Sequence, residues 1–485
     1  MIPNWLLQRA YLTPDRMALS FRDEQWTFRQ LSEEAARIAR KLRWNGLNEG
    51  DRIALLGRST PEMVFVIHGC LLAGLEIVML NSRLSSKEIS WQLNDCGAST
   101  ILADDEFLNR INEVSTPKLT FSAIESSDAL HCTFTKIWDP SRTITIMYTS
   151  GTTGFPKGVR QTAGNHTSSA LSSVLNLGLA ENDIWLCTMP LFHISGFSIL
   201  ARSVIYGMGV RLYEKFDVES IVEEIQNGTV TRISVVATGL HRILDQFEEN
   251  RSVAHPSFQT MLAGGGPVPD DYLRRARSYR LPVLQTYGMT ETSSQTATLS
   301  SEDALRKSGS AGKPLFFNQI KIRDVEQSGD FGEVLVMGPH VTPGYIGHAS
   351  DRDPLEDGWL PTGDIGYIDE EGYLFIVDRR SDLIISGGEN IYPAEIENVL
   401  ISHPHVKEAG VCGVDHPEWG SVPAAFIVGE ENLTVSDLER YCKQQLAGYK
   451  IPKMFYFVDE LPRNASNKLL RRELKEWAVS GGNKK

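Results

Sequence analysis

The alternation of helical and strand patterns over roughly the first 380 residues constrains the fold of this chain most. Apolar residues recur at helical spacing over 27–46, and the Ser-Thr-Pro sequence at 59–61 is typical of the start of a second helix over 59–75. Buried strands are expected from the short apolar runs at 51–57, 143–149, 232–238 and 282–288. Strands that alternate with helices favour mostly parallel sheets covered by helices, so we predict an α/β fold with a large N-terminal domain over residues 1–379.

The pattern changes between about residues 360 and 390, where Gly and Asp turns separate short strands. Beyond Pro393 the sequence predicts a helix over 394–403, strands around 408–414 and 424–428, and a helix over 434–447. This is typical of a separate α+β unit of about 100 residues. We therefore predict a small C-terminal domain over residues 380–485.

Charge and cysteine usage exclude several classes of partner. The formal net charge is −13, which argues against a general nucleic-acid or anionic-membrane surface. No apolar run approaches the ~18 residues that a membrane span requires. The six cysteines form no C-x-x-C pair, so neither a zinc site nor a disulfide framework is indicated. These features predict a reduced, cytoplasmic protein without a membrane span.

The stretch YTSGTTGFPKGV at 148–159 has the composition of a phosphate-binding loop. Glycines let backbone N–H groups approach a phosphate, hydroxyls add donors, and Lys157 supplies positive charge. The stretch differs from a Walker A loop, because Pro156 precedes Lys157 and Gly158 follows it. From composition alone, a solvated Gly/Thr loop is the alternative.

The same stretch resembles the signature loop of the adenylate-forming superfamily, which includes acyl-CoA ligases, luciferases and peptide-synthetase adenylation domains. Four further segments resemble its other motifs in the same order, at 287–292 (YGMTET), 361–379, 386–397 and 462–474. The resemblance implies that a carboxylate attacks the α-phosphate of ATP, that pyrophosphate leaves, and that a thiol then attacks the acyl-adenylate. The expected ligands are ATP, Mg²⁺, CoA and a small-molecule carboxylic acid, and a homo-oligomer is left open.

By this resemblance the nucleotide site combines the phosphate loop with the second and third motifs. Glu291 would bind Mg²⁺ together with Thr152, since a carboxylate beside phosphates is repelled unless a metal offsets the charge. Asp364 would accept hydrogen bonds from the ribose, although an Asp after Thr-Gly is also a common turn residue. The implied ATP- or AMP-binding residues are Thr149, Ser150, Gly151, Thr152, Thr153, Gly154, Lys157, Gly265, Gly266, Tyr287, Gly288, Thr290, Asp364 and Arg379.

The C-terminal domain of the resembled family is mobile and swings between the two half-reactions. Lys468 would be the catalytic cation for adenylation, because positive charge near the α-phosphate offsets the charge that develops there. Gly387 and Gly388 would line the tunnel for the CoA arm, and Arg380 and Ser381 would form the hinge. Many relatives carry Gly-Arg before the hinge and Asp or Lys at it, whereas this chain has Asp378-Arg379 and Ser381.

The acid substrate is indicated by the segment from 189 to 210. His193 in MPLFHISGF is a candidate catalytic or pocket residue, or an ordinary packed histidine. Arg202 lies in an otherwise apolar helical stretch and needs a partner, because a buried unpaired charge is costly. That partner is either a protein carboxylate or a second carboxylate on the substrate.

The beginning of the chain, the stretch 287–300 and the compact length resemble the o-succinylbenzoate–CoA ligases of menaquinone synthesis, whose substrate carries two carboxylates. The acyl-substrate residues would be His193, Arg202, Gly264, Ser293, Ser294 and Thr296. The alternatives are another aryl- or acyl-CoA ligase, an adenylation enzyme that loads a carrier protein, and a non-catalytic nucleotide-binding module.

Overall fold

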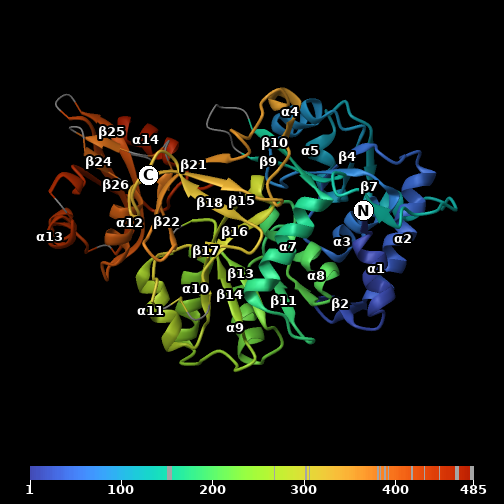
Figure 1. Ribbon diagram of the computed structural model, residues 1–485, viewed down its shortest axis with the longest axis horizontal. Helices are drawn as coiled ribbons and strands as arrows, with labels where there is room; N and C mark the ends of the chain where they lie inside the picture. Colours follow the sequence, from blue (N-terminus) through green and yellow to red (C-terminus); the bar gives the residue numbers. More distant parts are fainter. Residues whose placement is uncertain are drawn as a thin grey trace.

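The computed structural model describes residues 1–149, 156–266, 268–300, 303–304, 306–379, 382, 384–386, 389–391, 393–416, 419–430, 432–446, 448–464 and 469–480. A large lobe contains the elements from the N-terminus to β22 (Leu374–Arg379), and a smaller lobe contains the elements that follow it (Figure 1). The predicted α/β architecture with a small α+β unit is confirmed.

One sheet of the large lobe has the strand order β20-β10-β9-β5-β4-β6-β7. Its strands from β9 to β7 are parallel, whereas β10 and β20 add antiparallel strands at one edge. The bounds are β4 (Arg52–Leu56), β5 (Glu76–Met79), β6 (Thr100–Ala103), β7 (Lys118–Thr120), β9 (Thr143–Thr149), β10 (Lys157–Thr162) and β20 (Tyr345–Ile346). The two predicted strands in this sheet, at 51–57 and 143–149, are confirmed as β4 and β9.

The helices near this sheet are α2 (Phe28–Trp44), α3 (Pro61–Ala73), α4 (Ser86–Cys96), α5 (Leu108–Ile111), α6 (Phe121–Ser126) and the 3₁₀ turn η1 (Asp105–Phe107). Helix α2 begins after Thr27, which forms a capping box with Gln30. Helix α3 is buried at every position except Glu62, as expected for a helix that is apolar on all sides. Both predicted N-terminal helices are therefore confirmed.

The second large sheet has the order β17-β16-β15-β14-β13-β11-β12-β2-β3, with parallel pairing from β15 to β2. Its strands are β2 (Met17–Phe21), β3 (Glu24–Thr27), β11 (Ile184–Cys187), β12 (Gly209–Leu212), β13 (Arg232–Val235), β14 (Thr260–Ala263), β15 (Val283–Met289), β16 (Ser294–Thr298) and β17 (Lys313–Pro314). The helices near it are α1 (Trp5–Leu12), α7 (Ala163–Leu177), α8 (Ile194–Tyr206), α9 (Val218–Gln226), α10 (Ala237–Glu249) and α11 (Asp270–Ser278).

The predicted strand at 282–288 is confirmed as β15, but the strand predicted over 232–238 ends at Val235. Pairing with β14 stops at the same residue, and the next residues belong to the amphipathic helix α10, whose N-cap is Val236. The helical periodicity of the following sequence therefore shortens the strand.

A smaller antiparallel sheet, β18-β19-β21-β22, completes the large lobe. Its bounds are β18 (Gln319–Ile322), β19 (Gly332–Met337), β21 (Leu360–Ile368) and β22. Short elements elsewhere in this lobe are the pair β1 (Ile2–Pro3) and β8 (Ile137–Trp138) and the 3₁₀ turns η2 (Thr290–Thr292) and η3 (Gly347–Ala349).

The small lobe is built on a sheet of order β24-β23-β26-β25, with β27 paired to β26. Its elements are β23 (Ile384–Ser386), β24 (Glu389–Ile391), α12 (Pro393–Ile401), β25 (Val406–His416), β26 (Gly420–Gly429), α13 (Val435–Gln445), η4 (Gly448–Lys450), β27 (Met454–Phe457) and α14 (Arg471–Val479). The predicted helix-strand-strand-helix order of this unit is confirmed. Ile401 at the end of α12 packs against the core of the second large sheet, so the two lobes are in contact.

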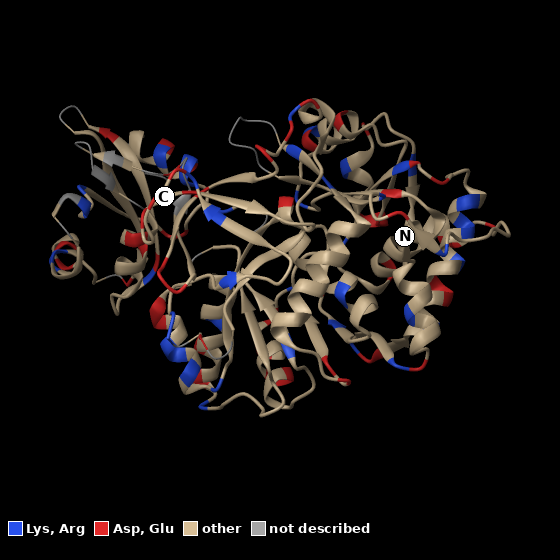
Figure 2. Ribbon diagram, viewed as in Figure 1, with Lys and Arg blue, Asp and Glu red and all other residues tan. Residues whose placement is uncertain are grey.

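Acidic and basic residues are interspersed along the ribbon of both lobes, and several arginines belong to α11 (Figure 2). Among the helices of the described residues, none combines the length and the apolar character that crossing a membrane requires.

Candidate active site

The stem of the predicted phosphate loop is an antiparallel hairpin of β9 and β10. Thr149 and Lys157 lie opposite each other at the open end of this hairpin. The Nζ atom of Lys157 lies 5.1 Å from the centre of the Tyr345 ring, a cation–π contact. Five predicted loop residues lie outside the described part of the chain: Ser150, Gly151, Thr152, Thr153 and Gly154.

The YGMTET segment at 287–292, at the end of β15, also lies near Tyr345. Glu291 lies in η2, and its backbone carbonyl accepts a hydrogen bond of 2.7 Å from the N–H of Thr342. Burial raises the pKa of Tyr345, and the carboxylate of Glu291 raises it further. Lys157 and Glu291 therefore both lie close to Tyr345, and they offer the cation and the carboxylate that a Mg²⁺–polyphosphate group requires.

A tight turn connects η2 to β16. Ser293 and Ser294 have positive φ angles of 49° and 109°, which are unusual for residues other than glycine. A Cβ atom on Gly288 would lie 1.7 Å from the carbonyl oxygen of Ser294, so only glycine allows β15 and β16 to approach this closely. The turn places Thr290, Glu291 and Ser294 within a short segment at the end of β15.

Tyr287 and Asp364 form a direct contact at the predicted nucleoside end. The Tyr287 hydroxyl donates a 2.7 Å hydrogen bond to Oδ2 of Asp364, whose side chain is buried. Arg379 lies opposite Asp364 in the pairing of β21 with β22. A carboxylate has about four acceptor sites, so it can accept hydrogen bonds from ribose hydroxyls as well as from protein donors.

The glycine run at 264–266 begins where β14 ends, beside β15. A Cβ atom on Gly264 would lie 2.8 Å from Cγ2 of Thr286, so this glycine is needed for close packing on β15. Gly265 has a φ of 81°, and among the described residues no heavy atom beyond the chain neighbours lies within 4 Å of a Cβ built on Gly266. The backbone at Gly266 is thus open to a ligand at the carboxyl end of the sheet, where ligands bind in open α/β folds.

A buried polar chain holds Thr290. Its carbonyl accepts a 2.8 Å hydrogen bond from Nε2 of Gln161, and Oε1 of Gln161 accepts one of 2.7 Å from the Thr145 hydroxyl. Nε2 of His166 lies 2.8 Å from the same hydroxyl. Because the Thr145 proton is given to Gln161, His166 must donate through Nε2–H. Burial lowers the pKa of His166 to about 3, which keeps the ring neutral.

Arg202 is the most informative residue on the acyl side. Its side chain in α8 is 2% exposed, its Nη2 donates a 3.2 Å hydrogen bond to the hydroxyl of Ser294, and its guanidinium lies 5.3 Å from the centre of the Trp185 ring. Among the described residues, its buried Nε has no hydrogen-bond partner and no carboxylate pairs with Arg202. Burial lowers the pKa of Arg202, an effect that the neighbouring Tyr206 opposes. A salt bridge to a protein acid, the alternative from the sequence, is therefore not found in the described part of the chain.

The surroundings of the other predicted acyl-site residues differ from one residue to the next. The hydroxyl of Ser293, next to Ser294, is buried, and no residue in the described part of the chain forms a hydrogen bond with it. His193 is the N-cap residue of α8, and its ring lies 4.6 Å from that of Phe192. Thr296 is fully buried, and its hydroxyl lies 3.1 Å from Nε2 of His340.

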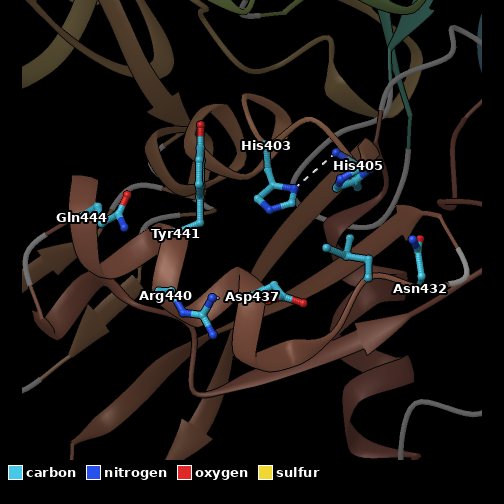
Figure 3. A pocket seen from close by; sticks show the side chains of 8 residues that line it. His403, His405, Asn432, Asp437, Arg440, Tyr441 and Gln444 are labelled. Carbon is cyan, nitrogen blue, oxygen red and sulfur yellow. Dashed lines mark hydrogen bonds and ion pairs between the residues drawn. The ribbon is translucent and has the colours of Figure 1, made fainter.

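The C-terminal site residues Lys468, Gly387 and Gly388 and the hinge residues Arg380 and Ser381 lie outside the described residues. A pocket on the small lobe, with a volume of about 410 Å³, is lined by polar side chains of α13 and of the turn after α12, including His403, His405 and Arg440 (Figure 3). None of the predicted site residues lines it.

Three residues of this region were not predicted from the sequence. Tyr345 lies against Lys157, Gln161 holds the Thr290 carbonyl, and Tyr206 lies one helical turn beyond Arg202. The glycines that flank Tyr345 and Ile346, at 344 and 347, were the available signal for the first. Gln161 and Tyr206 carry no local sequence signal, because their importance depends on partners that are distant in the chain.

Comparison with known proteins shows the family to which the chain belongs. Residues 6–346 match the family model described as AMP-binding enzyme, and residues 395–468 match the AMP-binding enzyme C-terminal domain. The 2-succinylbenzoate–CoA ligase of Bacillus pumilus is 49% identical over 478 residues, which cover 98% of this chain and 97% of that protein.

Two solved structures of the o-succinylbenzoate CoA synthetase of Bacillus subtilis have closely similar folds. The complex with the acyl-adenylate intermediate OSB-AMP has a TM-score of 0.92 at 47% identity and covers 98% of each chain. The complex with ATP and magnesium has a TM-score of 0.91 at 46% identity and covers 98% of this chain and 99% of that one. The protein therefore belongs to the AMP-binding, adenylate-forming enzyme family.

Buried histidines predict how stability depends on pH. Burial lowers the pKa of His68 to about 4 and of His166 and His340 to about 3, compared with about 6.5 in an unfolded chain. Between pH 6.5 and 4 the unfolded state binds more protons, so the free energy of unfolding contributed by these groups is present above pH 6.5 and falls with decreasing pH. Each histidine adds up to ~1.4 kcal/mol per pH unit to this slope.

We expect His166→Gln to make the slope shallower in urea unfolding measured between pH 7.5 and 4.5. The exposed His255, changed to Gln, is the matched control and should leave the slope unchanged. Equal slopes for wild type and His166→Gln would contradict the prediction.

Proposed function

We propose that the protein is an acid–CoA ligase that converts 2-succinylbenzoate, ATP and CoA into 2-succinylbenzoyl-CoA, AMP and pyrophosphate in menaquinone biosynthesis in the cytoplasm. The substrate assignment rests on Arg202. Its guanidinium is buried, has no acid partner among the described residues, and contacts Ser294 in the turn that follows Glu291. A substrate with a second carboxylate would supply the missing anion. The relatives named as 2-succinylbenzoate–CoA ligases, which match nearly the whole chain, support the same substrate.

In the first half-reaction, an oxygen of the reacting carboxylate attacks the α-phosphorus of ATP and the bond to pyrophosphate breaks. Lys157 would hold the β- and γ-phosphates, and Thr290 would contact the α-phosphate. Asp364, oriented by the Tyr287 hydroxyl, would accept hydrogen bonds from the ribose. Mg²⁺ held through Glu291 would neutralise charge on the phosphates.

Arg202 and Ser294 would hold the remote carboxylate and so fix the position of the reacting one. Binding energy from a part of the substrate that does not react is then used for orientation. In the second half-reaction the CoA thiol attacks the acyl carbon, and AMP leaves with the bond electrons. Lys468, on the small domain over 380–485, would offset charge in the first step, and Arg380 and Ser381 would allow that domain to bring Gly387 and Gly388 to the CoA arm.

A pyrophosphate-release assay across mono- and dicarboxylic acids, with ATP and CoA present, tests the substrate. We expect kcat/KM for 2-succinylbenzoate to exceed that for benzoate and for fatty acids by at least about a hundredfold, because a monocarboxylate would leave the buried guanidinium unpaired. A monocarboxylic acid that matched 2-succinylbenzoate would contradict the proposal and favour another aryl- or acyl-CoA ligase.

The role of Arg202 is tested by Arg202→Leu. Loss of a charge-assisted contact should lower kcat/KM for 2-succinylbenzoate by about a hundredfold, whereas KM for ATP should stay within about twofold. Arg202→Lys keeps the charge but loses the planar fork, so it should give an intermediate value. Arg29→Leu, at an exposed ion pair with Asp15, is the control for loss of an arginine. Unchanged dependence on 2-succinylbenzoate in Arg202→Leu would remove this residue from the site.

The role of Lys468 is tested by separating the half-reactions. Lys468→Ala should abolish formation of the acyl-adenylate, because no other cation is assigned to the charge at the α-phosphate, yet it should leave CoA transfer from supplied adenylate largely intact. Lys475→Ala is the matched control. This lysine lies seven residues after Lys468 in the lysine- and arginine-rich stretch 468–475, and its Nζ is 3.6 Å from Oδ1 of Asp415. Equal loss of both half-reactions would be inconsistent with this role.

A further inference from the structure

Asp95, near the C-terminal end of α4, is a buried carboxylate that contacts both sides of the phosphate-loop stem. Its side chain is 6% exposed. Oδ2 accepts a 2.7 Å hydrogen bond from the Tyr148 hydroxyl, and Oδ1 accepts from the backbone N–H of His348 at 2.8 Å and from its Nδ1 at 2.9 Å. Both carboxylate oxygens are therefore used by donors from outside α4.

The first partner, Tyr148, belongs to the strand that enters the loop. It is the penultimate residue of β9 and pairs with Gly158 of β10. Its ring packs edge-on against Trp91, which lies one turn before Asp95 in α4. The bond to Asp95 thus fixes the entering strand one residue before its end.

The second partner, His348, follows β20, the short strand that pairs with β10 next to Lys157. In that strand, Ile346 pairs with Gly158 and Tyr345 pairs with Val159. Tyr345 is the residue whose ring lies against Lys157. Asp95 consequently contacts β9, which enters the loop, and the residue that follows β20, which pairs with the leaving strand β10. Helix α4 lies beside β9 and β10 (Figure 1).

The backbone around Asp95 is shaped to admit the carboxylate. Gly347 has a φ of 65°, and a Cβ atom built on it would lie 2.2 Å from Oδ2 of Asp95. Only glycine tolerates both the conformation and the contact. Asp95 is an unsuitable Mg²⁺ ligand, because both of its oxygens already accept bonds from protein donors and the side chain is buried.

We propose that Asp95 is a positioning residue for ATP: it fixes the two strands of the phosphate-loop hairpin, β9 and β10, so that Lys157 at the start of β10 meets the β- and γ-phosphates. The inference rests on the role assigned to that loop under the proposed function, and it is independent of which acid the enzyme activates. A residue that acts through the phosphate-loop hairpin should affect the Kd for ATP far more than the Kd for AMP, which has no β- or γ-phosphate.

Calorimetric titration of the full-length protein with Mg·ATP and, separately, with AMP tests this difference without the acid or CoA. For Asp95→Ala we expect the Kd for ATP to rise about tenfold, the effect of losing hydrogen bonds to a charged group, and the Kd for AMP to stay within about twofold. Asp104→Ala is the matched control: this carboxylate follows β6 in the same sheet, is 15% exposed and pairs with Arg58, and it should change neither Kd.

Tyr148→Phe removes only one of the bonds and keeps the test valid if Asp95→Ala does not fold. We expect the same preferential weakening of ATP binding, smaller in size, and a less than additive effect in the double variant. Equal weakening of ATP and AMP, or unchanged ATP binding, in folded Asp95→Ala or Tyr148→Phe would overturn the proposal. An acid panel that failed to favour 2-succinylbenzoate would instead reject the substrate and leave this inference standing.

Discussion

The strained turn at Ser293 and Ser294 is the constraint on which the described site depends. Consecutive positive φ angles at these residues turn the chain from β15 into β16, and Gly288 lets the two strands meet without a Cβ between them. Glu291 precedes the turn, and Ser294 accepts the hydrogen bond from Arg202. Because the strain is held by surrounding contacts, the Glu291 carboxylate, proposed to bind Mg²⁺, and the Ser294 hydroxyl, proposed to face the acyl group, keep one relative position.

Arg202 shows why this fixed position matters for recognition. A buried guanidinium that meets neutral hydroxyls, an aromatic face and no carboxylate of the described residues is far from electrostatic balance. The proposed substrate would correct this with its second carboxylate, so part of the binding energy would come from relieving a cost already present in the free protein. Such a site discriminates against monocarboxylates, because those acids would leave the charge unpaired while excluding water from it.

The fold could be predicted from the sequence to the extent that local patterns determine it. Helix α2 and strand β9 follow from periodicity and capping, and the superfamily follows from short motifs such as the one around Lys157, a conclusion that the family match confirms. The partners of Arg202 could not be predicted, because Trp185 and Ser294 are brought to it only by tertiary packing. For the same reason the contact between the Thr296 hydroxyl and His340 could not be predicted.

The chain of hydrogen bonds from His166 to Thr290 connects the proposed nucleotide site to the helix that carries Arg202. His166 packs against Phe197 of α8, the helix that carries Arg202, and the chain ends at a residue proposed to contact the α-phosphate. Because His166 is neutral, each proton in the chain has one direction: from His166 to Thr145, from Thr145 to Gln161, and from the Gln161 amide to the Thr290 carbonyl. Reversing any bond would leave a buried donor or acceptor unpaired. The orientation of Thr290 is thus coupled to the packing of α8, and the acyl and nucleotide sites share one rigid polar support.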